Sequence, residues 1–385
     1  MAEGKSKLGC LLKVLVAVVV IPLLLVGIAI GVGISKRGLH QDAYYTYPFA
    51  KIPVELPRDH YAHDDFKTEW WYYTGHLYDE VGRRYGFEFT FFRLRTVNLW
   101  YNGVPVWWIM YPHGMAGHVA ITDFASDQFS VLEKMQQNSS DNAGASSTEY
   151  KAWLKNWMVS EKDGRHHIDA PGEKYGLDLW LKPLKPAALH GENGYHWKGV
   201  YGIPSYYISF TRMDVEGKIT VAGKPINVVG EAWMDHEYTS FKPSPKTRGW
   251  DWFSIQLDNN IEVMLYQMHR TDGAKSDDST GTVVLQDGST VAVTMPAYSI
   301  ESTGTWTSPR TGGIYPHGWI VKLPGYDAEL TVTPLRQDQE MVMELSQIEY
   351  WEGACDISGT WQGEPIKGKG YIELSGYTAP IANRF

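Results

Sequence analysis

The feature that most constrains this 385-residue chain is a long series of short aromatic and β-branched runs. From about residue 66 onward these runs alternate with clusters of Gly, Asn, Asp and Pro, the pattern of β-strands separated by turns. Helical periodicity is sparse, and its best candidate is Ser147–Met158, where a loop fits equally well. We therefore expect an all-β chain built of sandwiches or antiparallel barrels. A small closed barrel can hold one apolar ligand in its lumen.

The densest aromatic segment, residues 68–95, predicts a hairpin, and a similar pattern recurs later in the chain. Trp71 and Tyr73 open the first hairpin, and Trp250 and Trp252 stand at the same distance before the turn of the later one. This internal repeat predicts two similar β domains. We place them at residues 59–220 and 221–385.

The N-terminal part predicts a membrane anchor over residues 1–37. An uncharged run from 14 to 34 follows three lysines and is long enough to cross a hydrocarbon core of about 30 Å as a helix. No small-residue cleavage site is evident, although a cleaved signal peptide is the alternative. We expect a single-pass cytoplasmic membrane protein with its N-terminus inside. A linker over residues 38–58 would lead to β domains on the periplasmic or extracytoplasmic side.

Composition and motifs exclude several classes of function. The formal net charge of -9 offers no basic face, so nucleic acid is not expected as a partner. Cys10 and Cys355 are the only cysteines, and no Cys/His cluster of the zinc type is present, so we predict no metal. Phosphate-binding loops and the serine-hydrolase elbow are also missing from the sequence.

The segment GEAWMDHEYTS, residues 230–240, carries the residues best suited to chemistry. In a strand, Asp235 and Glu237 share one face with Trp233, whereas His236 and Tyr238 share the other. A carboxyl buried among rings has a raised pKa and stays protonated near neutral pH. Asp235 or Glu237 is thus a candidate general acid, with His236 and Tyr238 as partners. The alternative is a strand end at which the acids reach water or pair with an arginine.

Two further groups of residues invite a structural or a functional interpretation. Trp250 and Trp252 share a strand face opposite Asp251, and they form either core packing or a platform for a planar or polyene ligand. In the first hairpin we expect Glu69, Glu88 and Arg93 to be hydrogen-bonded structural groups at the domain interface, and a pair of Glu88 with Arg93 or Arg95 is one way to satisfy them.

Several longer motifs occur in order between residues 60 and 385. They are TEWWYYTGHL, GFEFTFFR, GEAWMDHEYTS, GWDWFSIQLDNNIEVMLYQMHR, YPHGW, YWEGACDISG and GYIELSGY. Together they resemble the AttH/CrtC-like family, a lipocalin-like or predicted secreted hydrolase family that includes carotenoid 1,2-hydratase. The resemblance implies two tandem lipocalin-like antiparallel β-barrel domains of the calycin type. It also implies acid chemistry without a metal or organic cofactor.

Carried over by position, the resemblance places the essential histidine of the hydratases on His236 and their tyrosine on Tyr266. The position of their tryptophan holds Tyr238, and that of their proton donor holds Met268, which argues against hydration of carotenoids. Another acid would have to replace the one missing at Met268. The candidates are Glu69, Asp235, Glu237 and Asp251.

Three functions fit these observations. The first is a membrane-anchored protein that binds an apolar fatty acyl, isoprenoid or polyketide-like ligand. The second is a cofactor-free hydratase, isomerase, cyclase or hydrolase acting on the same ligand class, and the third is a structural envelope protein. A carboxyl with a raised pKa and a hydrogen-bonded His or Tyr would favour catalysis. The catalytic candidates are His236, Tyr238, Tyr266, Asp235, Glu237 and Asp251, and the ligand-binding candidates are Trp70, Trp71, Tyr73, Trp233, Trp250, Trp252 and Met268.

Overall fold

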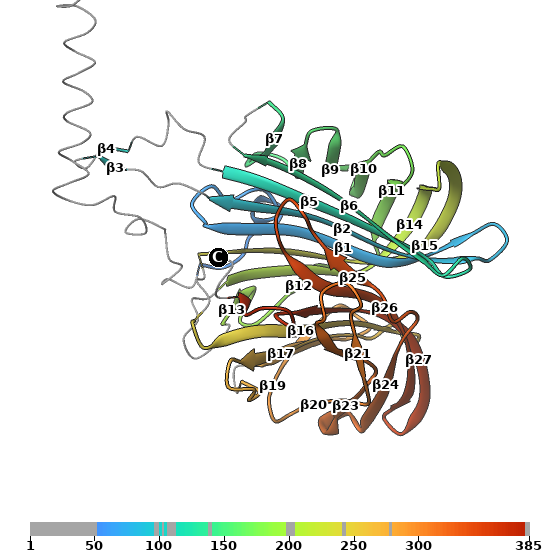
Figure 1. Ribbon diagram of the computed structural model, residues 1–385. Coiled ribbons are helices and arrows are strands. Elements are labelled where there is room, and N and C mark those ends of the chain that lie inside the picture. Colours follow the sequence, from blue (N-terminus) through green and yellow to red (C-terminus); the bar gives the residue numbers. More distant parts are fainter. Residues whose placement is uncertain are drawn as a thin grey trace, which may run out of the picture. The chain divides into compact units, whose positions relative to one another are not determined.

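The computed structural model describes most of the chain beyond residue 51 (Figure 1). The expected anchor and nearly all of the linker lie outside the described residues. Within the part that is described, no helix is long and apolar enough to cross a membrane. The described ranges are 52–95, 100–101, 104–105, 113–137, 141–197, 205–240, 244–276 and 279–381.

A 13-stranded antiparallel sheet, the first sheet, contains the aromatic hairpin. Its strands follow the order β6-β5-β2-β1-β15-β14-β11-β10-β9-β8-β7, with β12 and β13 paired to β14. The far end of this path returns to its start, because β8 contacts both β5 and β6. The strands are β1 (Thr68–Asp79), β2 (Arg84–Arg95), β5 (His113–Asp123), β6 (Gln128–Gln137), β7 (Ala143–Ala145), β8 (Lys151–Leu154), β9 (Trp157–Lys162), β10 (Arg165–Ala170), β11 (Gly176–Pro183), β12 (Ala188–Leu189), β13 (Tyr195–His196), β14 (Ser205–Val221) and β15 (Lys224–Thr239).

A 10-stranded sheet, the second sheet, follows the order β19-β18-β17-β16-β27-β26-β24-β23-β20, with β25 paired to β26. Its strands are β16 (Thr247–Leu257), β17 (Glu262–Arg270), β18 (Thr280–Val284), β19 (Thr290–Thr294), β20 (Ser299–Ser302), β23 (Trp319–Leu323), β24 (Ala328–Pro334), β25 (Glu340–Val342), β26 (Glu349–Trp361) and β27 (Glu364–Ser375). Short elements complete the description: η2 (Arg58–His60), η4 (Pro324–Tyr326), the pair β21 (Thr305–Thr307) and β22 (Ile314–Pro316), and the separate pair β3 (Trp100–Tyr101) and β4 (Val104–Pro105).

The two sheets repeat one topology, which confirms the predicted all-β fold with two lipocalin-like domains. In each sheet the first strand pairs with the next strand on one side and with the last strand on the other: β1 lies between β2 and β15, and β16 lies between β17 and β27. The helix candidate Ser147–Met158 is wrong, since this segment contains β8 and the start of β9.

The passage between the sheets falls later than the boundary expected at 220/221. That position is the end of β14, next to the tight turn into β15, where Ala222 and Gly223 both adopt positive φ. Strand β15 pairs with β14 between Lys224 and Thr239 and with β1 between Val228 and Thr239, so the chain leaves the first sheet after Thr239.

Each sheet encloses its own core, and alternation decides which residues enter it. Odd-numbered residues of β1 and β2, such as Trp71 and Phe89, fill the first barrel. In β16 the residues Phe253 and Ile255 fill the second barrel. The opposite faces of both hairpins carry large residues too, and these faces pack against each other.

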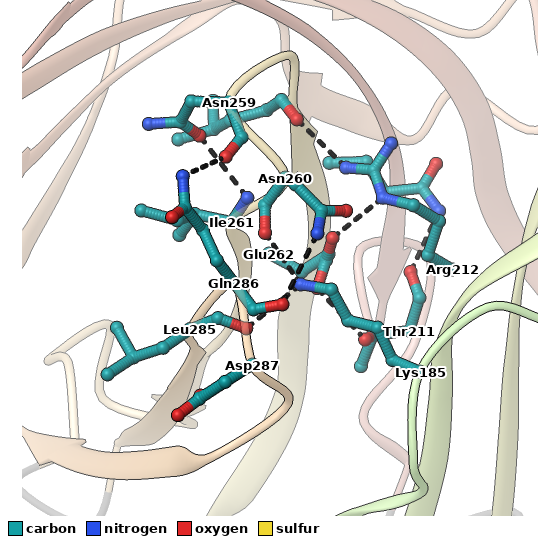
Figure 2. Close-up of polar contacts among 12 residues, drawn as sticks. Lys185, Thr211, Arg212, Asn259, Asn260, Ile261, Glu262, Leu285, Gln286 and Asp287 are labelled. Atoms are coloured by element: carbon teal, nitrogen blue, oxygen red, sulfur yellow. Dashed lines mark hydrogen bonds and ion pairs between the residues drawn. The ribbon is translucent and has the colours of Figure 1, made fainter.

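A polar clamp joins the two sheets at Glu262, the first residue of β17 (Figure 2). The Nζ of Lys185 lies 2.8 Å from its Oε2, and the Nε of Arg212 lies 2.7 Å from its Oε1. A β-bulge in β14 places two successive residues on this side, so that Thr211 also donates to Glu262, at 3.2 Å. Lys185 additionally donates to the carbonyls of Asn260 and Leu285. The clamp therefore satisfies a fully buried carboxylate with donors from β14 and from the connection between β11 and β12.

Candidate active site between the two sheets

The outward-facing residues of the two hairpins form a cluster of rings and thioethers between the sheets. Because odd-numbered residues of β1 enter the first barrel, Trp70 and Tyr72 face the second sheet. Tyr72 and Trp252 meet edge to face with ring centroids 5.3 Å apart, and Trp233 meets Trp252 at 6.1 Å. This inter-sheet aromatic cluster consists of Trp70, Tyr72, Tyr207, Trp233, Trp250, Trp252, Met264, Tyr266 and Met268.

Asp235 lies beside this cluster and is 3 % exposed. Its Oδ2 accepts a hydrogen bond from Tyr207, and its Oδ1 accepts from Ser209 and from the Nε1 of Trp233. Burial raises the pKa of Asp235 to about 7, although these donors oppose the rise. Both carboxyl oxygens of Asp235 therefore accept hydrogen bonds from neighbouring side chains.

Glu237 follows on the same face of β15, opposite Trp70 of β1, and is fully buried. Neither Asp235 nor Glu237 reaches water, so the alternative of a solvated strand end is excluded for both.

A second set of carboxyls lies where the edge of the aromatic cluster meets the last hairpin. We call Glu88 of β2, Glu352 of β26 and Glu373 of β27 the inter-sheet acid cluster. Tyr72 donates to the Oε2 of Glu352 at 2.9 Å, and the Nε1 of Trp250 donates to the Oε1 of Glu373 at 2.9 Å. The acid cluster and the aromatic cluster are therefore one continuous region.

The pKa values of Glu88 and Glu352 are raised well above the ordinary value for a carboxyl. Burial is the largest cause in both, and the negative charge of Glu373 adds to it. Both residues are fully buried. The Oε2 of Glu88 and the Oε1 of Glu352 have no hydrogen-bond partner, and neither has the hydroxyl of nearby Tyr371. Buried carboxyls that hold a proton and have a free oxygen can serve as general acids near neutral pH.

Another part of the predicted site lies inside the first barrel, on the opposite face of β1 and β15. Trp71 stacks on His236 with ring centroids 5.1 Å apart. The hydroxyl of Tyr73 lies 2.8 Å from the Nδ1 of His166, and Tyr238 stacks on His63 at 3.5 Å. His236 and Tyr238 are thus separated by the sheet from Tyr266, with which the family resemblance grouped them.

His236 is anchored by Glu69, whose Oε1 lies 2.9 Å from the Nε2 of His236 and 2.9 Å from the Nδ1 of His63. Burial acts to raise the pKa of Glu69, but Arg93 and the two histidines outweigh it and hold that pKa well below its usual range. Glu69 is therefore ionised and cannot be the missing proton donor. It also lies inside the barrel and not at the domain interface, where we expected it.

Asp251 belongs to neither group, because it faces the interior of the second barrel. The hydroxyl of Tyr377 donates to its Oδ1 at 2.7 Å, and the Nε2 of His269 lies 3.0 Å from the same atom.

The expected pairing of Glu88 with an arginine of its own strand is wrong. Glu88 accepts a hydrogen bond from Thr90, whereas Arg93 pairs with Glu69 and Asp64. Residues 88 and 93 are an odd number of positions apart, so their side chains point to opposite faces of β2.

Sequence reasoning also missed Glu352 and Glu373 as chemical groups. Both stand in motifs that carried the family resemblance, YWEGACDISG and GYIELSGY. Only the folded chain brings them beside Tyr72 and Trp250, which stand far from them in the sequence.

A shallow groove of about 380 Å³ lies elsewhere, over strands β8 to β10. None of the predicted site residues lines it. Its lining residues are Lys151, Trp153, Lys155, Asn156, Trp157, Met158 and Asp169.

Two antiparallel sheets of one topology, each with its own core and with buried acids between them, define a two-domain lipocalin-like protein. The chain belongs to the AttH-like family, which it matches over residues 47–377. The AttH protein of Nitrosomonas europaea is similar, with 32 % sequence identity and a TM-score of 0.75; the match covers 85 % of this chain and 98 % of that one.

A second solved structure shares the fold. Kievitone hydratase from Nectria haematococca matches with 13 % identity and a TM-score of 0.67, covering 87 % of this chain and 96 % of its own. Among the curated proteins, none matches this chain.

Proposed function

We propose that this protein is a cofactor-independent acid–base enzyme of the hydratase type, acting on an apolar unsaturated molecule bound between the two sheets. The observation that carries the proposal is the inter-sheet acid cluster. Glu88 and Glu352 are fully buried, have raised pKa values, and each keeps one carboxyl oxygen without a partner. A buried polar atom without a partner costs about 1–3 kcal/mol, so a purely structural interface would not be expected to keep two.

Glu352 is the residue best placed to donate the proton. Its Oε2 accepts a hydrogen bond from Tyr72, and its Oε1 has no hydrogen-bond partner and could donate a proton to a substrate. The proton would pass to one carbon of a double bond, whose π electrons form the new C–H bond. Water would then add to the other carbon and return a proton to the carboxylate, so that the net change is the addition of one water.

The inter-sheet aromatic cluster supplies what this reaction needs besides an acid. Its rings and thioethers offer an apolar surface, at about 25 cal/mol per Å² of apolar area removed from water. The faces of Trp252 and Trp233 would also stabilise the positive charge that develops on the carbon chain. The likeness in fold to kievitone hydratase supports the same reaction class.

A carrier of apolar ligands is the second candidate, and the aromatic cluster is the observation that favours it. A carrier would gain nothing from carboxyls kept protonated beside its ligand, since burying them costs free energy. A structural envelope protein is the third candidate. It would need neither an aromatic surface for a ligand nor protonated carboxyls beside it.

We further propose that residues 14–34 anchor the chain in the cytoplasmic membrane, with the β domains on the extracytoplasmic side. The support is the uncharged length of this run and the lysines that precede it. This position would expose the β domains to lipids and other apolar molecules of the envelope.

The test begins with the full chain purified in detergent from its own source. Native mass spectrometry after lipid extraction identifies any apolar molecule that copurifies. That molecule is then incubated in ¹⁸O-labelled water with wild type, with Glu352→Gln and with Glu364→Gln, the same change at an exposed position of β27.

Hydration predicts a product heavier by one labelled water with wild type and Glu364→Gln. We expect at least about a 100-fold loss with Glu352→Gln, the contribution typical of a general acid. Binding without any product would favour the carrier. A protein that copurifies with nothing and binds no polyene or fatty acyl probe would favour the structural candidate.

A further inference from the structure

We propose that His63, Glu69 and His236 form a binding site for a divalent transition-metal ion of the zinc type, inside the first barrel. The Nδ1 of His63, the Oε1 of Glu69 and the Nε2 of His236 all lie within 4.8 Å of one another. They come from three separate places: the segment after η2, strand β1 and strand β15. Two imidazole nitrogens and one carboxylate oxygen are a donor set that zinc and related ions accept.

Neighbouring charged groups lie beside Glu69 and His63, whereas the Nδ1 of His236 has no hydrogen-bond partner. Arg93 donates to the Oε2 of Glu69 at 2.5 Å, and the Oε1 faces the two imidazoles and the backbone N–H of His63. The Oδ1 of Asp59 lies 3.7 Å from the Nε2 of His63, the nitrogen that faces away from Glu69. A carboxylate behind a ligating histidine fixes its orientation and raises its basicity.

An independent observation concerns His60, which lies beside these three residues inside the first barrel. His60 is 3 % exposed, yet neither of its ring nitrogens has a hydrogen-bond partner. Its ring lies edge-on to His236, with centroids 5.5 Å apart, and stacks on Tyr150 at 4.0 Å. A buried imidazole without partners is costly. A metal-bound water, or the ion itself, would supply the partner that His60 lacks.

The local charge also suits a dication. Asp59, Asp64 and Glu69 contribute three negative charges, whereas Arg58 and Arg93 contribute two positive charges. The net charge of these five groups is -1 when the histidines are neutral, so the surroundings of the site would not repel a cation.

The site would have a consequence for the first barrel. His63 stands in the segment between η2 and β1, and His60, the last residue of η2, packs against Tyr150 and His236. A bound ion would fasten the segment to β1 and β15. The site lies on the face of the first sheet opposite the inter-sheet acid cluster, so it is independent of the proposed reaction.

The experiment uses the full chain, purified in detergent without a histidine tag and treated with a chelator. Co²⁺ is titrated as a spectroscopic probe, because its visible d–d absorption reports nitrogen and oxygen ligands in a distorted site. We expect wild type to bind a single Co²⁺ ion that Zn²⁺ displaces. His63→Ala and Glu69→Gln should abolish the absorption, and Asp59→Asn should weaken affinity by about 10- to 100-fold.

The matched control is His167→Ala, which removes a surface histidine that pairs with Asp178 of β11. It should bind Co²⁺ as wild type does. His63 is the mildest ligand to remove because its side chain is 17 % exposed, and circular dichroism checks that the variant folds. The absence of a Co²⁺ spectrum in wild type, or the same spectrum in His63→Ala, would overturn the proposal and leave a hydrogen-bonded network only. Glu352→Gln should bind Co²⁺ normally, which keeps this test separate from that of the reaction.

Discussion

At the scale of single residues, Glu352 offers a test that needs no substrate. Its pKa is raised by burial and by Glu373 and Glu88, while Tyr72, Tyr350 and Tyr371 are the other titratable groups around it. The folded chain therefore keeps a proton that the unfolded chain loses above its ordinary pKa of 4.5. The contribution of Glu352 to stability is complete below that pH and is lost as the pH rises through the raised value.

Glu352→Gln removes this proton linkage while keeping the shape of the side chain. We expect the variant to gain stability relative to wild type as the pH rises from 5 to 9, by up to about 1.4 kcal/mol per pH unit. Urea unfolding at several pH values, with Glu364→Gln as control, measures the difference. Parallel pH profiles for wild type and Glu352→Gln would show that Glu352 titrates normally in the folded chain.

The sequence predicts which residues share a face of a strand. It does not predict which of the two faces carries the candidate site. Period-two alternation separates Asp235 from His236 and Trp250 from Asp251, as the structure shows. The partner of Tyr72, in contrast, stands 280 positions away. No local pattern indicates such a contact, because it depends on how the two sheets pack.

At the scale of elements, the bulge in β14 and the start of β17 form the clamp around Glu262. Lys185 and Arg212 both point their charges at this one buried carboxylate. Glu262→Gln would leave two buried cations with a neutral partner, and we expect a loss of about 3–5 kcal/mol in the free energy of unfolding. Glu231→Gln, which removes only the half-exposed partner of Arg212, should cost less than about 1 kcal/mol. Equal losses in the two variants, measured by urea unfolding, would contradict the role of the clamp.

The hairpins themselves were predictable because each is local, with a strong aromatic pattern on either side of a turn. The return of β15 to β1 was not, since it joins residues about 160 positions apart, as in the pairing of Trp71 with His236. That long-range pairing is also why the expected domain boundary fell too early. A turn signal marks a change of direction, and it does not show which sheet the next strand joins.

At the scale of the whole molecule, the internal repeat and the family motifs were enough to predict two lipocalin-like domains. They could not show how extensively the two domains pack against each other. The aromatic cluster, the acid cluster and the clamp all lie between the sheets. Additional contacts join them, such as the hydrogen bond from His76 of β1 to the carbonyl of Gly370 in β27, at 3.0 Å.

Because the two sheets bury these residues against each other, we expect the sheets to unfold together. We expect a single urea transition with coincident midpoints by tryptophan fluorescence and by far-ultraviolet circular dichroism. Hydrogen–deuterium exchange with mass spectrometry follows each sheet separately. In Glu262→Gln, both sheets should lose their protection from exchange at the same urea concentration, and that concentration should be lower than in wild type. If β18 to β24 lost protection while β5 to β11 kept theirs, the sheets would be independent folding units. The site between them could then open without unfolding either barrel, and access for a substrate would be explained by separation of the sheets rather than by movement within one.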